Sequence, residues 1–264
     1  MTELIEPLQL PRPDEGIFAF NTTRGKAERG KPYSEWNLCD YVGDDALCVL
    51  NARLTLCAQL GIELDHLVMP RQTHSLRVAV IDEDYLAADF AEQESRLDGV
   101  DALVTSLRGV CIGVNTADCV PVVLADEQAG VIAVAHSGWR GTVGRIAAAT
   151  VQAMKRLGGD PVRIQAAMGP SICQDCFEVG DEVVDAFAKA RHDLAAISHR
   201  NPDTGKAHIH LREAIRLTLL QTGVAANGIA IDAHCTHCHP DRYFSARRMG
   251  TNSGRTFTGI MMKP

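Results

Sequence analysis

The sequence has no block of basic residues and no apolar run long enough to cross a membrane. Its net charge is −7, which argues against a nucleic-acid-binding surface and against electrostatic attachment to a membrane. The first sixteen residues contain early acids and three prolines, without the charged-then-apolar order of a secretory signal. We therefore expect a cytoplasmic protein whose partners are neither nucleic acids nor membranes.

Several sequence motifs are also absent. The chain has no GxGxxG fingerprint, no P-loop and no GxSxG elbow. It therefore lacks the signatures of common dinucleotide-binding proteins, nucleotide triphosphatases and serine hydrolases. It has no short-period repeat and no low-complexity linker, so we predict one domain over residues 1–264. Nine cysteines, an odd number in a chain this long, fit reduced thiols better than a disulfide framework.

The apolar pattern predicts short strands and a few helices. Strands are expected over 16–20, 66–69, 76–81, 101–105, 110–114, 120–125, 131–135, 162–168, 229–233 and 256–262. Helices are expected over 44–60, 142–157, 181–190 and 211–222, with Leu47, Leu50, Leu54 and Cys57 on one face of the first. Strands come in hairpin pairs without strict alternation with helices, which predicts an α+β fold with mixed sheets.

The central stretch is the predicted hairpin over 120–135. If it folds about the midpoint of Glu127 and Gln128, Cys119 lies opposite His136. Directly opposed residues of an antiparallel pair have Cβ atoms about 4.5–5.5 Å apart. A thiolate and an imidazole at that spacing can share a metal ion or act as a nucleophile and its base. The alternative is a buried cysteine that fills space beside a hydrogen-bonded histidine.

His74, which follows the strand predicted over 66–69, is a third candidate ligand. Two histidines and one cysteine form an open set that leaves a fourth tetrahedral position for water or substrate. This donor set favours zinc, although copper uses the same atoms. A histidine at a strand end is more often an ordinary polar residue, so ligand chemistry alone leaves both interpretations open.

The SGWRG turn after His136 leads into a predicted helix. Its glycines allow close approach of a ligand, Arg140 could bind phosphate and Trp139 could stack on a base. An ordinary strand-to-helix turn with a buried tryptophan explains the same residues.

Two CxxC pairs lie in the second half of the chain, at Cys173 with Cys176 and at Cys235 with Cys238. Paired CxxC motifs can form a four-thiolate zinc site. Here 58 residues lie between Cys176 and Cys235, well beyond the usual spacing, which favours ordinary free cysteines.

Together, several motifs resemble those of the laccase-domain (YfiH-like) family, formerly called multicopper polyphenol oxidases and now treated as broad purine nucleoside phosphorylases. The motifs are QTH at 72–74, NTADCVPVVLAD at 115–126, AHSGWRG at 135–141, GPSI at 169–172, FEVG at 177–180 and CTHCHPDRYFSARR at 235–248. The resemblance covers nearly the whole chain. It implies a layered α/β/β/α-type arrangement of mixed, largely antiparallel sheets with outer helices.

The resemblance also implies a catalytic zinc site made of His74, Cys119 and His136. The implied activities are phosphorolysis of adenosine, guanosine, inosine and methylthioadenosine, with phosphate as co-substrate, and deamination of adenosine. Zinc would polarise a water that attacks C6 of the purine, or a substrate hydroxyl. From motif position we expect four substrate-binding residues, with the arginines for phosphate: Arg24, Asn37, Gln72 and Arg248. We expect a monomer or a small homo-oligomer.

Three other functions are compatible with the same residues. A copper-dependent polyphenol oxidase would need more imidazole ligands than are convincingly placed. A cysteine hydrolase, for example one that edits a cell-wall precursor, would use Cys119 as nucleophile and His136 as base. A binding protein with a purely structural zinc would need a fourth protein ligand.

Overall fold

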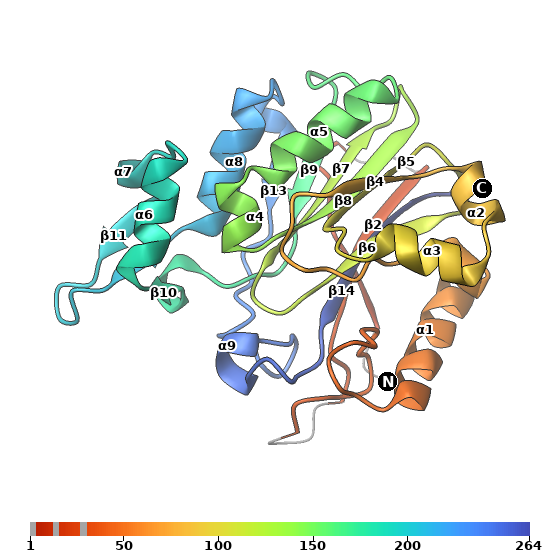
Figure 1. The fold of residues 1–264 in the computed structure, drawn as a ribbon, viewed down its shortest axis with the longest axis horizontal. Helices are drawn as coiled ribbons and strands as arrows, with labels where there is room; N and C mark the ends of the chain where they lie inside the picture. Colours follow the sequence, from red (N-terminus) through yellow and green to blue (C-terminus); the bar gives the residue numbers. More distant parts are fainter. Residues whose placement is uncertain (1–3, 13–15, 27–30) are drawn as a thin grey trace.

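The structure, a computed structural model, describes residues 4–12, 16–26 and 31–264. Its strands form three sheets (Figure 1). The five-stranded sheet has the order β1 (Ile5–Pro7), β2 (Ile17–Thr22), β14 (Thr256–Met262), β6 (Cys111–Thr116) and β3 (Leu67–Val68). The six-stranded sheet has the order β13 (Ile229–Ile231), β9 (Gln165–Met168), β7 (Val120–Asp126), β8 (Val131–Ser137), β5 (Ala102–Thr105) and β4 (Val78–Ile81). The small sheet contains β10 (Glu178–Val179), β12 (Ala207–Ile209) and β11 (Ser198–Arg200).

The helices lie outside these sheets. They are α1 (Ala46–Leu60), α2 (Glu83–Ala87), α3 (Phe90–Leu97), α4 (Trp139–Val143), α5 (Ile146–Arg156), α6 (Asp181–Lys189), α7 (Leu194–Ile197), α8 (Leu211–Gln221) and α9 (Ala246–Met249). In Figure 1, α5 and α8 cover one side of the sheets, α1 lies at the other side, and α6 and α7 project with β10 and β11 at one end.

Three apolar clusters define the layers. One cluster joins α5 and α8 to the six-stranded sheet, for example through Met154, Leu219 and Val122. A second lies between the two large sheets, where residues such as Ile112 of β6 meet residues such as Val134 of β8. The third packs α1 on the outer face of the five-stranded sheet. The predicted α+β fold with layered, mixed sheets is confirmed, because β3–β6, β4–β5 and β9–β13 pair parallel and the other strand pairs are antiparallel.

The face of α1 that carries Leu47, Leu50, Leu54 and Cys57 is not the one that packs on the sheet. Leu47, Leu50 and Leu54 are 71%, 40% and 47% exposed. The helix instead packs through a neighbouring stripe, and its buried residues are Val49, Ala52, Leu56 and Cys57. Both stripes are apolar at helical spacing, so only the tertiary contacts distinguish them.

The single helix predicted over 142–157 is divided in two. Helix α4 begins after Gly138, and Arg145 then adopts the left-handed conformation, with φ of 62°, before α5 begins. This residue changes the direction of the chain, because a left-handed residue cannot continue a right-handed helix.

The predicted hairpin exists, but its register differs from the prediction. Asp126 pairs with Val131 across a loop of four residues, and Pro121 is the partner of His136. Extending this register beyond β7 places Cys119 opposite Gly138, two residues from the predicted partner. A shift of two residues preserves the face of the sheet, so Cys119 and His136 remain diagonal neighbours on one side.

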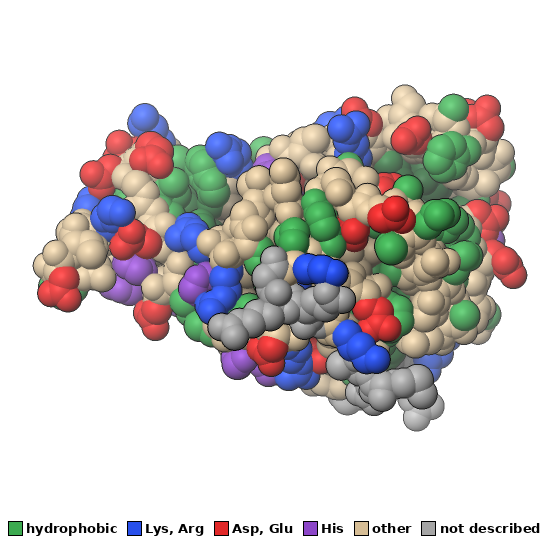
Figure 2. All heavy atoms as spheres, turned by 90° about the horizontal axis from the view of Figure 1, so that it is seen from below, with side chains coloured by type: hydrophobic (Ala, Val, Ile, Leu, Met, Phe, Trp, Pro, Cys, Tyr) green, Lys and Arg blue, Asp and Glu red, His purple; other side chains and the backbone are tan. Residues whose placement is uncertain are grey.

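Among the described residues, no helix combines the length and apolar character needed to cross a membrane. On the face seen in Figure 2, acidic and basic side chains are interspersed rather than separated by sign. Among the described side chains that this view shows, the basic ones form no continuous surface of the kind that binds a nucleic-acid backbone.

Candidate metal and active site

His74, Cys119 and His136 converge on one point. Each offers one ligand atom, and these atoms all lie within 4.8 Å of one another. The Cys119 Sγ is 3.8 Å from His74 Nε2, and the two imidazole rings meet edge to face with centroids 4.8 Å apart. His136 is buried, Cys119 is half-buried and His74 is exposed, so the group is open on the His74 side.

Asp101, at the start of β5, holds both histidines in place. Its buried carboxylate accepts hydrogen bonds from the backbone N–H groups of Thr73, His74 and Ser75, at 3.1, 3.1 and 2.7 Å. The same carboxylate lies 2.7 Å from His136 Nδ1, which leaves Nε2 of that ring for a metal. A carboxylate that orients a ligating imidazole is the usual outer partner in metal sites. These bonds also stabilise the left-handed backbone of His74, with φ of 61°.

The charges of Cys119 and His136 are coupled. Burial opposes ionisation of the thiol, but the adjacent His136 and His74 imidazoles lower the pKa of Cys119 to about 6. Burial likewise opposes a charge on His136, while the Cys119 thiolate and the Asp101 carboxylate raise its pKa to about 9. The thiol therefore ionises near neutral pH, and the thiolate is the form that binds metals.

Gly138 leaves room for this group. A Cβ atom at this position would lie 2.8 Å from Cys119 Sγ and 2.9 Å from His74 Cδ2, closer than atoms of this kind approach in proteins. Any side chain here would displace a ligand. Glycine is therefore required by the close approach of the ligands rather than by its φ of −70°.

The three ligands lie in a cleft of about 890 Å³, large enough for a small organic substrate. Aromatic and basic side chains contribute to its walls, among them Tyr41, Trp139, Phe177, Arg247 and Arg255. A cleft of about 920 Å³ shares Tyr41 and Asn115 with it, but none of the three ligands lines that second space.

Gln72 is the one predicted substrate-binding residue that the structure places in the lining of the cleft, as far as the described residues extend. Its amide donates to the backbone oxygen of Asn115 and accepts from the Asn115 N–H, both at 2.8 Å. This pairing fixes the QTH loop against β6. Substrate contact by Gln72 stays a prediction.

Arg24, Asn37 and Arg248 are not among the residues that line the cleft. The buried Arg24 guanidinium donates to Ser34 and to the backbone oxygen of Pro240. Asn37 is buried and its side chain bonds to the backbone at Cys39 and to Asp44. Arg248 is exposed and donates to the backbone oxygen of His237. Their contacts are those of residues that hold loops together, and their roles in substrate binding stay untested predictions.

Asp101 and Arg247 are two functional candidates that the sequence does not single out. Asp101 looked like any acid at the start of a strand, and only the fold brings it to both histidines. Arg247 lies beside Arg248 in the same motif, and no spacing rule distinguishes the two. Trp139 does line the cleft, while the neighbouring Arg140 stacks on its ring with 4.3 Å to the centroid.

The four cysteines of the two CxxC pairs also come together, although the long separation had favoured independent free thiols. Their sulfur atoms all lie within 4.8 Å of one another. The spacing rule failed because two loops from distant parts of the chain lie side by side.

Comparison with known proteins shows the family of the chain. Residues 18–263 match the family described as multi-copper polyphenol oxidoreductase laccase. The chain belongs to this family. It is 64% identical to "Adenosine deaminase RL5" from an unknown prokaryotic organism, over 98% of this chain and 99% of that protein. It is 42% identical to "Purine nucleoside phosphorylase" of Bacteroides thetaiotaomicron, over 93% of this chain and 92% of that protein.

Solved structures share the family fold. The crystal structure of YlmD from Geobacillus stearothermophilus aligns with a TM-score of 0.85 at 33% identity, covering 95% of this chain and 93% of YlmD. The YfiH-like resemblance and its layered fold are thereby confirmed.

Proposed function

We propose that the protein is a zinc-dependent purine nucleoside phosphorylase of broad specificity that also deaminates adenosine. The substrates would be adenosine, guanosine, inosine and methylthioadenosine. The observation that carries this proposal is the convergence of His74, Cys119 and His136 on the cleft of about 890 Å³. Relatives named adenosine deaminase and purine nucleoside phosphorylase, at 64% and 42% identity, support the choice of reaction.

The donor set fits zinc. Two imidazoles and a thiolate are three of the four ligands of a catalytic zinc site, and the exposed His74 side leaves the fourth position facing the cleft. When bound, zinc supplies a Lewis acid that polarises an oxygen or stabilises a developing negative charge. Copper also binds two histidines and a cysteine, and the family description names copper, so copper is the alternative metal.

The protein residues around the metal ligands have two tasks. Asp101 holds the proton of His136 on Nδ1 and fixes the QTH loop, so that the ligands are in place before substrate binds. Trp139 and Phe177 offer aromatic surfaces on which a purine can stack inside the cleft.

Phosphate needs a cation in the same cleft, and Arg247 is better placed for this than Arg24 or Arg248. Arg247 lines the cleft and is exposed, with one guanidinium nitrogen 3.3 Å from the backbone oxygen of Cys176. Arg255 also lines it, but donates to the carbonyls of its own turn. In phosphorolysis a phosphate oxygen bonds to the anomeric carbon while the glycosidic bond breaks. The electron pair of the glycosidic bond goes to the leaving base. A guanidinium orients the phosphate oxygens for this attack.

We infer a single catalytic domain that acts in the cytoplasm on purine nucleosides and phosphate, as a monomer or a small homo-oligomer.

A cysteine hydrolase is the second candidate, and one arrangement favours it. Cys119, His136 and Asp101 stand in the order of nucleophile, base and orienting carboxylate. Such an enzyme could edit a cell-wall precursor. His74 beside the thiol has no role in that mechanism, whereas it completes a metal site. Activity that survives complete metal removal, together with a trapped thioester on Cys119, would establish the hydrolase.

The test is to incubate the purified, zinc-loaded protein with inosine and adenosine, with and without phosphate, and to separate the products. We expect hypoxanthine and ribose 1-phosphate from inosine only when phosphate is present, and inosine from adenosine without phosphate. Chelation should abolish both reactions, and zinc should restore them. Absence of phosphate-dependent base release would contradict the phosphorylase, and recovery with copper but not zinc would reverse the metal assignment.

A further inference from the structure

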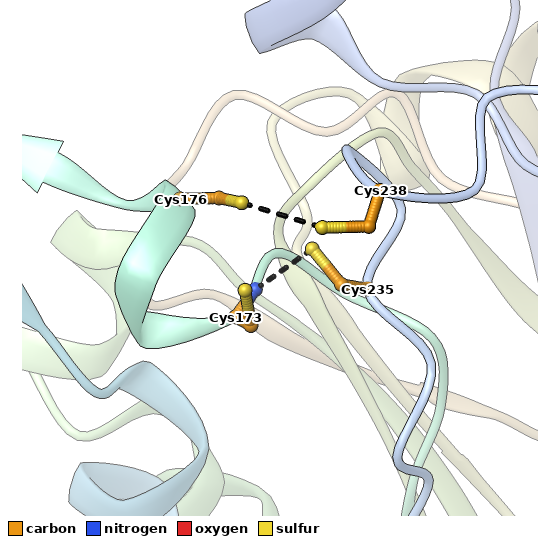
Figure 3. A group of neighbouring side chains, drawn as sticks. All are labelled: Cys173, Cys176, Cys235 and Cys238. Atoms are coloured by element: carbon orange, nitrogen blue, oxygen red, sulfur yellow. Dashed lines mark hydrogen bonds between the residues drawn. The ribbon is translucent and has the colours of Figure 1, made fainter.

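The four CxxC cysteines come from two loops on different elements. Cys173 and Cys176 lie between β9 and β10, while Cys235 and Cys238 lie between β13 and α9. Figure 3 shows the four sulfur atoms pointing toward a common centre. All of them lie within 4.8 Å of one another, and the Sγ atoms of Cys176 and Cys238 are 3.5 Å apart. The cluster is separate from the His74, Cys119 and His136 group.

These distances suit a tetrahedral metal. Zinc–sulfur bonds of about 2.3 Å in a regular tetrahedron place neighbouring sulfur atoms about 3.8 Å apart. A disulfide would require about 2.05 Å, so the 3.5 Å between Cys176 and Cys238 is a separation between independent thiols. Four cysteine ligands close the coordination sphere, which is typical of a structural zinc site.

The backbone supports this arrangement. The N–H of Cys173 donates to the Sγ of Cys235 at 3.2 Å. Amide hydrogen bonds to sulfur are outer-shell contacts that stabilise a thiolate ligand.

A buried arginine joins the two loops. Arg212 of α8 donates through Nε to Ser171 Oγ at 2.8 Å and through Nη1 to the backbone oxygen of Asp232 at 2.7 Å. Its Nη2 donates to the backbone oxygens of Ser171 and His234, both at 2.5 Å. A parallel bridge between Ser171 and Cys235 continues this contact to the cysteines.

Arg212 also bears on the charge of the cluster. It is buried, and no carboxylate in the described part of the chain forms an ion pair with it. Burial lowers its pKa, while Asp232 and the thiols of Cys235 and Cys173 oppose that shift. A zinc ion with four thiolates carries a net charge of −2. Such a site would add its negative charge to that of Asp232 beside this buried cation.

We propose that Cys173, Cys176, Cys235 and Cys238 form a second, structural zinc site that fixes one wall of the substrate cleft. We infer the effect on the wall because the cysteine loops contact side chains that line the cleft. The Arg247 guanidinium bonds to the backbone oxygen of Cys176 and lies over the Phe177 ring at 5.4 Å, and both side chains line the cleft. Asp118, which also lines the cleft, accepts from Thr236 Oγ1 at 2.7 Å and from the N–H of Arg247 at 2.6 Å.

The test is the number of zinc ions per chain in the full-length protein, purified in reductant and measured by elemental analysis. We expect two in the native protein, one in Cys119→Ala, one in Cys238→Ser and none in the double variant. Cys48→Ser is the matched control, because this exposed cysteine on α1 belongs to neither group, and it should retain two.

A second measurement leaves the cluster untouched and so does not depend on the folding of Cys238→Ser. In Cys119→Ala, the remaining zinc should show only sulfur neighbours, at about 2.3 Å, by X-ray absorption. Nitrogen or oxygen neighbours, iron in place of zinc, or a native protein with one zinc per chain that Cys238→Ser leaves unchanged would each overturn the proposal. A Cys176–Cys238 disulfide in the native protein would do the same.

The effect of the four-cysteine site on the cleft is measured separately, through KM. This part rests on the proposed function. Cys238→Ser should raise the KM for phosphate and nucleoside severalfold, with a smaller change in kcat. If a variant that has lost its second zinc keeps its KM, the site does not fix the wall of the cleft, although the zinc site itself stands. The zinc counts need no catalytic activity, so they stand even if the protein proves not to be a phosphorylase.

Discussion

The two cysteine-containing groups differ in the charge that supports them. The His74, Cys119 and His136 group is backed by a carboxylate, Asp101, whereas the four-cysteine cluster is backed by a guanidinium, Arg212. A divalent ion with one thiolate carries a positive net charge, and one with four thiolates carries a negative net charge. In each group the buried partner therefore has the charge opposite to that of the loaded site, as expected where ions are removed from water.

The groups also differ in access. The first includes an exposed histidine at a cleft, and the second uses four ligands of one kind between two loops. An open site with three protein ligands can act on a substrate, while a closed site can only hold structure. Changes near Cys119 should therefore affect turnover more than stability.

The largest effect is expected from Cys119→Ala. Loss of this ligand should lower kcat/KM by about 10³-fold or more, because a metal contributes several kcal/mol to catalysis. The fold should persist, since the four-cysteine cluster is untouched. The measurements are phosphorolysis of inosine, zinc content and thermal unfolding, with Cys48→Ala as the control. Equal losses in both variants would contradict a specific role for Cys119.

Gly138→Ala should lower kcat/KM by about 100-fold, because the new methyl group must displace Cys119 or His74, and small misplacements of catalytic groups cost about that factor. The zinc of the four-cysteine cluster should remain, so the total zinc content should not fall below one ion per chain. Native activity in this variant would mean that the ligands do not need their present spacing.

Asp101→Asn should weaken zinc binding at the open site about 10- to 100-fold, since the amide cannot accept from all the groups that the carboxylate holds. Competition with a zinc chelator measures this affinity. Asp98→Asn is the matched control, because Asp98 is exposed and nearby. If both variants bind zinc equally, Asp101 does not orient His136.

The smallest effect is expected from a change at Arg247, which lines the cleft and bonds to the backbone of Cys176. Arg247→Gln should raise the KM for phosphate about tenfold, the value of one charged hydrogen bond, with little change in the KM for inosine. Arg248→Gln, the adjacent exposed arginine, should leave both KM values close to those of the native enzyme. The reverse result would return the phosphate-binding role to Arg248.

The positions of the strands can be predicted from the sequence more accurately than the register in which they pair. The apolar runs of β7, β8 and β14 predict the strand positions to within one or two residues, because these strands are buried on both faces. The hairpin register was wrong by two, since the centre of the loop over 127–130 depends on the conformation of Gly130, with φ of 61°. Cys119 and His136 are still near each other, as diagonal neighbours rather than as the predicted direct pair, because a slip of two residues keeps the face.

Other features required the tertiary structure. Asp101 lies 35 residues from His136 in the chain, and nothing in its local sequence distinguishes it from other acids. The four-cysteine cluster forms because β9 and β13 are neighbours in a parallel pair, so the loops that follow them begin side by side. Periodicity and spacing rules describe single segments, and they do not describe which loops meet.

Strand β14 has a consequence for the way the protein folds. It lies between β2 and β6, and it follows every other strand of that sheet in the sequence. During synthesis β2 and β6 therefore emerge without their shared neighbour, each with an unpaired backbone edge. The apolar cluster that holds Phe20 beside Phe257 can form only after β14 has been synthesised. We expect late, non-local folding in which nascent chains that lack β14 depend on chaperones.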